Sequence, residues 1–186
     1  DGFFERFGLR GVTDKVIQAL MNLLPSHLPA RMREYRDRFE HHLLVRVSND
    51  TVEQTRAFLT EYFSGSASGA YFECDAEEGR KAFLHRFAIA GAAIRYREAH
   101  RSSVEDILAL DIALRRNDRD WVETLPQEME EQIIHKLYYG HFFCHVFHQD
   151  YIVKKGNDPL AMEHAMWKLL DERRAEYPAE HNVGHL

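Results

Sequence analysis

The sequence predicts an α+β fold: a ferredoxin-like antiparallel sheet with helices packed on one face, plus a short helical N-terminal segment. Three observations support this fold class. Apolar residues make up 45% and charged residues 29% of the chain, which is typical of a globular protein. Segments with the two-residue apolar period of strands alternate with segments of helical period. The helical segments have about 10–15 residues, the length of a crossover between strands.

Composition and cysteine content argue against several classes of protein. The net charge of −6 gives no electrostatic support for binding nucleic acid. Cys74 and Cys144 form no CxxC motif, which argues against a disulfide framework and a cysteine-based zinc site. The longest uncharged stretch, residues 16–30, is too short and too polar to span a bilayer. Because the sequence starts at Asp1 and stops abruptly, we expect it to be part of a longer protein.

Strand-like patterns occur in five segments. The first alternates apolar Leu43, Val45 and Val47 with other residues. The last is rich in aromatic and β-branched residues, which favour strands. The five predicted strands are residues 41–50, 70–75, 92–100, 105–116 and 140–156.

Four helices are predicted from their start signals. Asp50 with Glu53, and Asp75 with Glu78, have the spacing of a capping box. A third helix is expected from Pro126 through Met129 and Ile133 to Leu137, and a fourth from Asp158–Pro159. Apolar residues share one side of the first helix (Phe58, Leu59, Tyr62, Phe63), face the core in the second (Phe83, Leu84, Phe87) and line one side of the last (Met162, Met166, Leu169, Leu170).

Residues 1–40 differ from residues 41–186, and we expect two regions that meet at this boundary. Within residues 1–38, seven basic residues outnumber five acidic ones, although the whole chain is acidic. Short amphipathic helices with Phe and Leu on one face and Arg on the other lie in membrane interfaces. A pair of surface helices that covers the core has the same pattern, so both interpretations stay open at this point.

Three histidines, His141, His145 and His148, fall within the block GHFFCHVFHQD. In an uninterrupted strand His141 and His145 share one face and His148 points to the other, so a site that uses both His141 and His148 needs a turn or bulge between them. Glu180 and His181 form a second cluster near the end of the chain. Two imidazoles and a carboxylate are the usual ligands of a divalent ion with an open position. Histidines that are hydrogen-bonded at a sheet edge are the alternative.

The segment HRFAIAGAAIRYR contains Arg86, Arg95 and Arg97. An arginine on the core-facing side of a helix requires an anion or a carbonyl group as its partner. The alternative is an arginine whose charged end reaches solvent, which is the more common arrangement. The residues alone therefore leave a substrate-binding role for these arginines open, as the less common of the two arrangements.

Four stretches together resemble the C-terminal half of the FAD-linked, quinone-dependent D-lactate dehydrogenases of bacteria. They are FLHRFAIAGAAIRY, EDILALDIALRRND, KLYYGH…VFHQDYIVKKG and YPAEHNVGHL, and the resemblance extends over essentially the whole chain. It implies an FAD domain outside this sequence, a cap domain over the substrate and a membrane-binding insertion in the cap. Residues 41–186 then correspond to the cap, and residues 1–40 to part of the membrane-binding segment.

The resemblance also implies a function and a location. Such a protein oxidises D-lactate to pyruvate and passes electrons to a membrane quinone of the respiratory chain. It lies on the cytoplasmic side of the bacterial inner membrane as a peripheral protein, in contact with an anionic membrane surface. Because FAD is bound mainly by the domain outside this sequence, the chain alone is expected to be inactive.

Related FAD-linked 2-hydroxy-acid dehydrogenases have a G-H-x₆-H motif and a later E-H-x-x-G motif. The first is matched at residues 140–148 and the second at residues 180–184. The resemblance implies a divalent metal such as zinc held by His141, His148 and Glu180, a general base at His181 and a substrate-binding arginine at Arg86.

These roles suit the oxidation of a 2-hydroxy acid. An arginine, which is always charged, can hold the substrate carboxylate with two hydrogen bonds. A neutral histidine can take the hydroxyl proton near pH 7. The flavin accepts the hydride, and a metal ion lowers the pKa of the hydroxyl group.

Two other functions are compatible with the residues. The chain can be a peripheral membrane-binding module in which residues 1–38 contact the lipid, or a ferredoxin-like metal-binding regulatory domain without catalysis. Binding to lipid vesicles would support the first alternative. Flavin bound to the full-length protein would exclude the second.

Overall fold

The computed structural model describes residues 16–20, 23–24, 26–65 and 68–179. The chain forms two compact units, and each is described by itself. The sheet unit comprises Asp1–Leu24 and Ile89–Leu186, and the helical unit comprises Pro25–Ala88. The domain boundary predicted at residue 40 stays a prediction.

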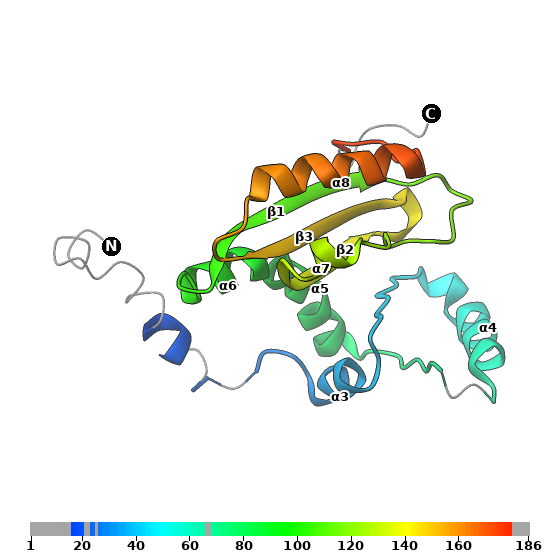
Figure 1. The fold of residues 1–186 in the computed structure, drawn as a ribbon. Coiled ribbons are helices and arrows are strands. Elements are labelled where there is room, and N and C mark those ends of the chain that lie inside the picture. Colours follow the sequence, from blue (N-terminus) through cyan, green and yellow to red (C-terminus); the bar gives the residue numbers. More distant parts are fainter. Residues whose placement is uncertain (1–15, 21–22, 25, 66–67, 180–186) are drawn as a thin grey trace. The chain divides into compact units, whose positions relative to one another are not determined.

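The sheet unit contains a three-stranded antiparallel sheet in the order β1-β3-β2 (Figure 1). Its strands are β1 at Val104–Ala113, β2 at Ile133–His141 and β3 at Val146–Lys154. The 3-10 turn η2, Phe142–Cys144, and the left-handed residue His145 connect β2 to β3. Strand β3 is therefore the central strand, and both of its edges are hydrogen-bonded.

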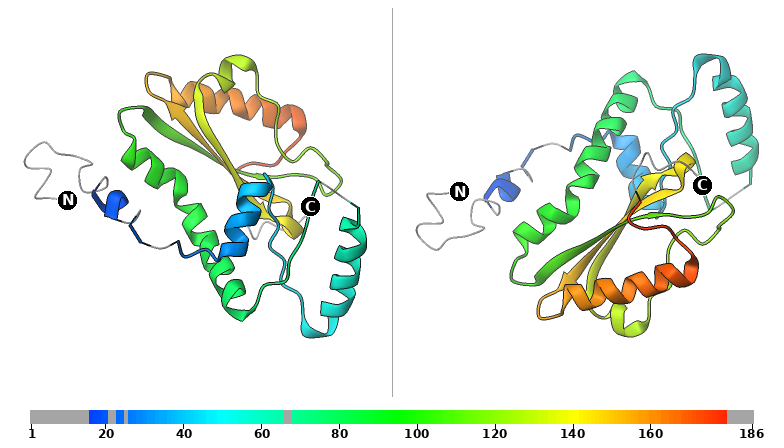
Figure 2. Two further views of the ribbon diagram at one scale, coloured as in Figure 1. Left: turned by 90° about the horizontal axis from the view of Figure 1, so that it is seen from below. Right: turned by 90° about the horizontal axis from the view of Figure 1, so that it is seen from above.

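One face of this sheet is apolar and is covered by helix α8, Pro159–Arg173 (Figures 1 and 2). The Asp158 carboxylate caps the helix, because it accepts hydrogen bonds from the backbone N–H groups of Leu160 and Ala161 at 3.0 and 3.2 Å. The predicted start of this helix is confirmed. The core between α8 and the sheet includes Met162, Met166, Leu170, Leu108, Leu110, Ile112, Phe147, Tyr151 and Val153.

Helix α6, Ala92–Ala99, packs against one end of the opposite face (Figure 1). Its residues Ala93 and Tyr96 contact a small cluster that contains Ile107 and Ile152 of the sheet. Helices therefore lie on both faces of the sheet, and the prediction that they pack on one face is wrong. The reason is that successive residues of β3 point to opposite faces, and apolar residues occur at both sets of positions.

The α+β class is confirmed. A ferredoxin-like sheet has a fourth strand, and the parts of the chain that the structure describes contain three strands. After α8 the chain runs back along the outer edge of β1. Ala113 and Glu176 exchange backbone hydrogen bonds of 2.9 and 3.0 Å, and the Ala179 N–H donates to the Asp111 carbonyl at 2.8 Å.

The helical unit contains α3 at Ala30–Arg38, the 3-10 turn η1 at Asn49–Thr51, α4 at Val52–Phe63 and most of α5 at Ala76–Ala90. The capping box predicted at the start of α5 is confirmed. The Glu78 N–H donates to the Asp75 carboxylate at 2.8 Å, and the Asp75 N–H donates to the Glu78 carboxylate at 3.0 Å. The cap predicted at Asp50 is wrong, because α4 begins after Thr51 without a side-chain cap.

The strands predicted at residues 41–50 and 70–75 are wrong. Residues 41–48 and 70–75 belong to no strand, and in the first segment Leu43 is 61% exposed. An alternating pattern favours an extended chain, but a strand forms only where a neighbouring strand satisfies its N–H and C=O groups. Neither segment has such a neighbour among the described residues.

In two other segments the predicted type of secondary structure, helix or strand, is wrong. Residues 92–100 were predicted as a strand, but 92–99 form α6, in which alanines favour the helix. The helix predicted from Pro126 to Leu137 is limited to α7, Gln127–Glu130, and β2 follows at Ile133. The β-branched and aromatic residues of β2 favour a strand, and pairing with β3 provides its hydrogen bonds.

A carboxylate connects the start of β1 to the turn after β3, and we expect a pH-dependent contribution to stability from it. Glu105 accepts hydrogen bonds from the Gly156 N–H at 2.9 Å and from Lys155 Nζ at 3.0 Å. The Gly156 and Lys155 hydrogen bonds lower the pKa of Glu105 from its usual 4.5. The stabilisation is therefore present above pH 4.5 and is lost as the pH falls through the lowered pKa of the folded state.

Glu105→Gln should lower the Tm at pH 7, and the difference from the unsubstituted chain should shrink as the pH falls below about 4.5. Thermal unfolding followed by circular dichroism over a pH series measures this. A difference in Tm that grows as the pH falls would contradict the assignment.

Candidate functional site

The face of the sheet opposite α8 becomes polar beyond the part that α6 covers. Asp111 of β1, His148 of β3 and Tyr139 of β2 occupy directly opposite positions on the three strands. We call these three residues the polar row. His148 Nδ1 is hydrogen-bonded to Asp111 Oδ1, and the Tyr139 ring stacks on the imidazole with 5.0 Å between ring centroids. The imidazole is thus contacted from both neighbouring strands.

His141 lies on the same face as His148, at the end of β2. The two ring centroids are 6.1 Å apart and the rings are nearly perpendicular. The turn that the sequence required between them exists, since η2 and His145 reverse the chain. His145 itself lies in this turn, with Nδ1 3.2 Å from the Arg115 carbonyl oxygen. The structure therefore brings His141 and His148 together on one face, whereas His145 lies in the turn between β2 and β3.

Burial changes the pKa of Tyr139, a member of the polar row, and of the neighbouring Asp150. Tyr139 Oη donates a hydrogen bond of 3.1 Å to Asp150 Oδ2. Burial raises the pKa of Asp150, and the Tyr139 hydrogen bond acts against this shift. Burial and the neighbouring Asp150 raise the pKa of Tyr139 to about 12. Tyr139 therefore keeps its proton at neutral pH and can act as the donor in this hydrogen bond.

The helical unit has a different character, because many of its apolar side chains are exposed. Among its described residues only Leu28 and Ala82 are buried. Phe83, Leu84 and Phe87 are exposed, so the prediction that they face the core is wrong. A helix buries its apolar side only where another element covers it. We call the following residues the exposed apolar set: Leu43, Leu44, Val45, Val47, Phe58, Tyr62, Phe83, Leu84 and Phe87.

Most basic side chains of the helical unit lie beside carboxylates. Arg38 is 3.1 Å from Glu34, and Arg80 is 2.8 Å from Glu77. Further pairs are Arg31–Glu78, Arg36–Asp37, Arg56–Glu53, Arg56–Glu73 and Lys81–Glu77. Such exposed pairs contribute about 0–1 kcal/mol each, so a competing anion can replace the carboxylate at low energetic cost.

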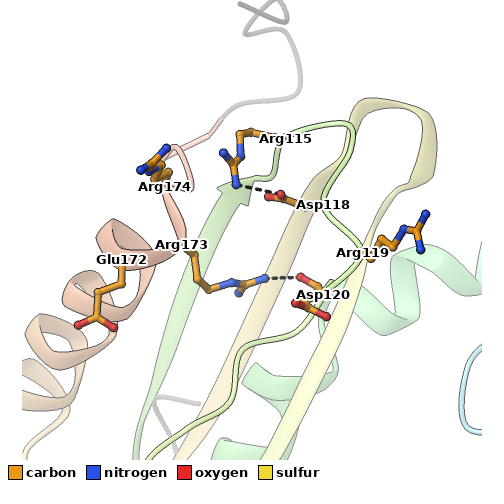
Figure 3. A pocket seen from close by; sticks show the side chains of 7 residues that line it. All are labelled: Arg115, Asp118, Arg119, Asp120, Glu172, Arg173 and Arg174. Carbon is orange, nitrogen blue, oxygen red and sulfur yellow. Dashed lines mark hydrogen bonds and ion pairs between the residues drawn. The ribbon is translucent and has the colours of Figure 1, made fainter.

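A pocket of about 370 Å³ lies in the sheet unit at the C-terminal end of α8 (Figure 3). Arg115 donates to Asp118 at 3.1 Å, and Arg173 donates to the Asp120 carbonyl group. The lining is entirely charged, which does not suit the aromatic ring of a quinone. The lining residues are Arg115, Asp118, Arg119, Asp120, Glu172, Arg173 and Arg174.

Comparison with known proteins identifies the family. The family model for "D-lactate dehydrogenase, membrane binding" matches residues 1–186. The chain belongs to this membrane-binding family. None of the helices in the described ranges combines the length and the apolar character needed to cross a bilayer.

Three relatives of this membrane-binding chain are named quinone-dependent D-lactate dehydrogenase. The protein from Escherichia coli K12 is 60% identical over 94% of the chain and 30% of the relative. The protein from Haemophilus influenzae is 55% identical over 94% of the chain and 31% of the relative. The protein from Corynebacterium glutamicum is 44% identical over 100% of the chain and 33% of the relative. The chain thus spans about one third of these relatives, and the family predicted from the sequence is confirmed.

The predicted site residues of the membrane-binding chain fall in three places. His141 and His148 lie on the polar face of the sheet. Arg86 belongs to the helical unit, where it is exposed and its guanidinium carbon lies 4.8 Å from the centre of the Phe87 ring. Glu180 and His181 lie outside the described residues.

The metal site stays a prediction. Within the residues that the structure describes, no group of three or more His, Cys, Asp or Glu side chains is arranged to hold a metal ion. Its third predicted ligand, Glu180, is not among them. The residue before it, Ala179, is hydrogen-bonded to the backbone of Asp111, which belongs to the polar row.

Sequence reasoning missed Asp111, Tyr139 and Asp150. A signal existed for Asp111, because it is an acidic residue inside the apolar run ILALDIAL and Asp is uncommon in strands. Alternation also places Asp150 on the same face as His148. The pairing of these residues depends on the register between strands, which no local pattern specifies.

Proposed function

We propose that the chain is the cap and membrane-binding part of an FAD-dependent D-lactate dehydrogenase that oxidises D-lactate to pyruvate and passes electrons to a membrane quinone. The observation that supports it is 60% identity, over 94% of the chain, to a protein named quinone-dependent D-lactate dehydrogenase. The two other relatives have the same name. These names favour an enzyme over a regulatory metal-binding domain.

In this proposal the polar face of the sheet forms part of the substrate site. His141 and His148 lie on one face, and the Asp111 carboxylate at His148 Nδ1 leaves the lone pair of a neutral ring on Nε2. This donor set, together with Glu180, suits a divalent ion such as zinc. When bound, such an ion lowers the pKa of the substrate hydroxyl group.

His181 and Arg86 are the other two residues for which we propose a role in catalysis or substrate binding. His181, which follows Glu180 directly, takes the hydroxyl proton of D-lactate. Arg86 holds the substrate carboxylate through two hydrogen bonds. FAD, bound mainly by residues outside this chain, supplies the hydride acceptor.

The helical unit is proposed to bind the membrane surface as a peripheral module, on the cytoplasmic side of the bacterial inner membrane. Its exposed apolar set supplies side chains that can enter the interface, and its arginines can exchange their carboxylate partners for lipid phosphates. Residues 1–38 add basic residues, of which Arg6, Arg10 and Lys15 lie outside the described residues. An anionic membrane is therefore the proposed surface.

We also propose that the sheet unit is ferredoxin-like. The strand order β1-β3-β2 matches three consecutive strands of that fold, in which the fourth strand pairs with the outer edge of the first. The segment from Glu176 to Ala179 runs along that edge of β1.

Binding to the membrane should depend on the exposed apolar set. Burial of one Phe side chain contributes about 1.5–3 kcal/mol, so Phe58→Ser with Phe87→Ser should weaken binding by at least about tenfold. Co-sedimentation with vesicles that contain phosphatidylglycerol measures this. Leu160→Ser is the matched control, because Leu160 is 58% exposed, close to the 62% of Phe58, but lies in the sheet unit. An equal loss of binding in the double variant and in Leu160→Ser would contradict the assignment.

Residues 1–38 should contribute the salt-sensitive part of this binding. A basic residue near an anionic surface contributes about 1 kcal/mol, and the five acidic residues of the segment reduce the sum. A chain that begins at Glu40 should bind more weakly than the whole chain at about 0.01 M salt, with a smaller difference at about 1 M salt. Equal binding by the two chains at low salt would exclude a role for residues 1–38.

Loss of the general base should slow flavin reduction. In the full-length enzyme, His181→Asn removes the proton acceptor and should slow flavin reduction by D-lactate about 10²–10⁴-fold, while FAD stays bound. Stopped-flow absorbance of the flavin measures the rate. His145→Asn is the control, because His145 lies in the hairpin turn with φ 51°, a left-handed conformation that Asn tolerates. If both substitutions slow the reaction equally, His181 is not the base.

A further inference from the structure

Within the polar row, Asp111 makes a specific side-chain contact with His148. Asp111 and His148 are directly paired across β1 and β3, and their side chains are hydrogen-bonded through Oδ1 and Nδ1. The His148 side chain is 16% exposed and the Asp111 side chain 52%. The imidazole is thus the more buried partner of the pair, and the carboxylate is the more exposed one.

This hydrogen bond determines where the imidazole proton lies. A carboxylate accepts hydrogen bonds and does not donate them, so the nitrogen that faces it carries the proton. A neutral imidazole with its proton on Nδ1 has its lone pair on Nε2. Tyr139, stacked on the other side of the ring, restricts rotation of the ring plane. Tautomer and orientation are therefore both set by residues on neighbouring strands.

We propose that Asp111 is the positioning residue of His148: its carboxylate holds the imidazole in the tautomer protonated at Nδ1, which places the ligating lone pair on Nε2 for a divalent ion. The proposal rests on the proposed metal-binding role of His148. Carboxylates that hold metal-ligating histidines in this way raise the basicity of the ligand, and their loss typically costs about 10–100-fold in metal affinity.

A purely structural ion pair explains Asp111 less well. The Asp111 carboxylate is 52% exposed, so water screens its charge and the pair contributes little to stability. Asp is also unfavourable inside a strand relative to a β-branched residue. Asp111 interrupts an apolar run in which Leu110 and Ile112 are buried on the other face. The backbone of Asp111 is paired independently of its side chain, since its carbonyl accepts the Ala179 N–H.

The tautomer of His148 tests the proposal directly. In the 186-residue chain labelled with ¹⁵N-histidine, long-range ¹H–¹⁵N correlations distinguish the protonated from the unprotonated ring nitrogen, and His148→Gln assigns the signals. The unsubstituted chain should show His148 protonated at Nδ1. In Asp111→Asn the amide NH₂ can donate to Nδ1, so the proton should move to Nε2, as occurs when the carboxylate of a Ser-His-Asp triad becomes an amide.

Asp106→Asn is the matched control. Asp106 lies on the same strand, its side chain is 51% exposed, and it forms an ion pair with Arg97 at 2.5 Å. The substitution Asp106→Asn should leave the His148 tautomer unchanged. A His148 protonated at Nε2 in the unsubstituted chain, or the same tautomer in Asp111→Asn as in Asp106→Asn, would overturn the proposal.

Measurement of zinc binding tests the proposed metal site separately from the positioning role of Asp111. Titration calorimetry with Zn²⁺ should show an affinity about 10–100-fold lower for Asp111→Asn than for Asp106→Asn. If Zn²⁺ binds the unsubstituted chain and both variants with equal affinity, the positioning role is wrong. If the unsubstituted chain binds no Zn²⁺ while His148 is protonated at Nδ1, the proposed metal site fails and the orientation of His148 by Asp111 stands.

Discussion

Strand β3 is hydrogen-bonded along both edges, and the positions of the other elements of the sheet unit depend on this pairing. Its residues alternate between two faces. Tyr151 and Val153 face α8 and the main core, whereas Ile152 faces the cluster beneath α6. Because β3 lies in the centre, β1 and β2 present their own alternating residues on the same two faces. One sheet thus supports the main apolar core on one side, and a smaller apolar cluster beside a polar region on the other.

The same pairing assembles the candidate site from residues that are distant in sequence. Asp111 and His148 are 37 positions apart, and Tyr139 belongs to a third strand. Polar residues inside a central strand are costly unless they are hydrogen-bonded. His148 Nδ1 is hydrogen-bonded to the Asp111 carboxylate, and Asp150 accepts the hydrogen bond from Tyr139. The polar face therefore combines partial burial with defined hydrogen bonds, which is the environment in which a histidine can be held in one tautomer.

The helical unit differs from the sheet unit in the exposure of its apolar side chains. Its helices bury few of their own apolar side chains, and most of its basic side chains form ion pairs with exposed or partly exposed carboxylates. The chain belongs to a membrane-binding family, and in the proposed function these exposed side chains contact the membrane. In water an exposed apolar patch is unfavourable, but it becomes favourable when a lipid interface covers it.

The sequence by itself determined what depends on neighbouring residues: strand β1, the β-rich run that contains β3, the capping box at Asp75 and Glu78, and the start of α8 at Asp158. It also determined the family, through motifs that extend over the chain. Only the tertiary structure decided that residues 41–48 and 70–75 form no strands, because a strand requires a partner that supplies its hydrogen bonds. It also decided that a turn brings His141 and His148 onto one face and that Asp111 lies opposite His148. These contacts depend on strand register, which is fixed by packing between segments far apart in the chain and not by the pattern within any one of them.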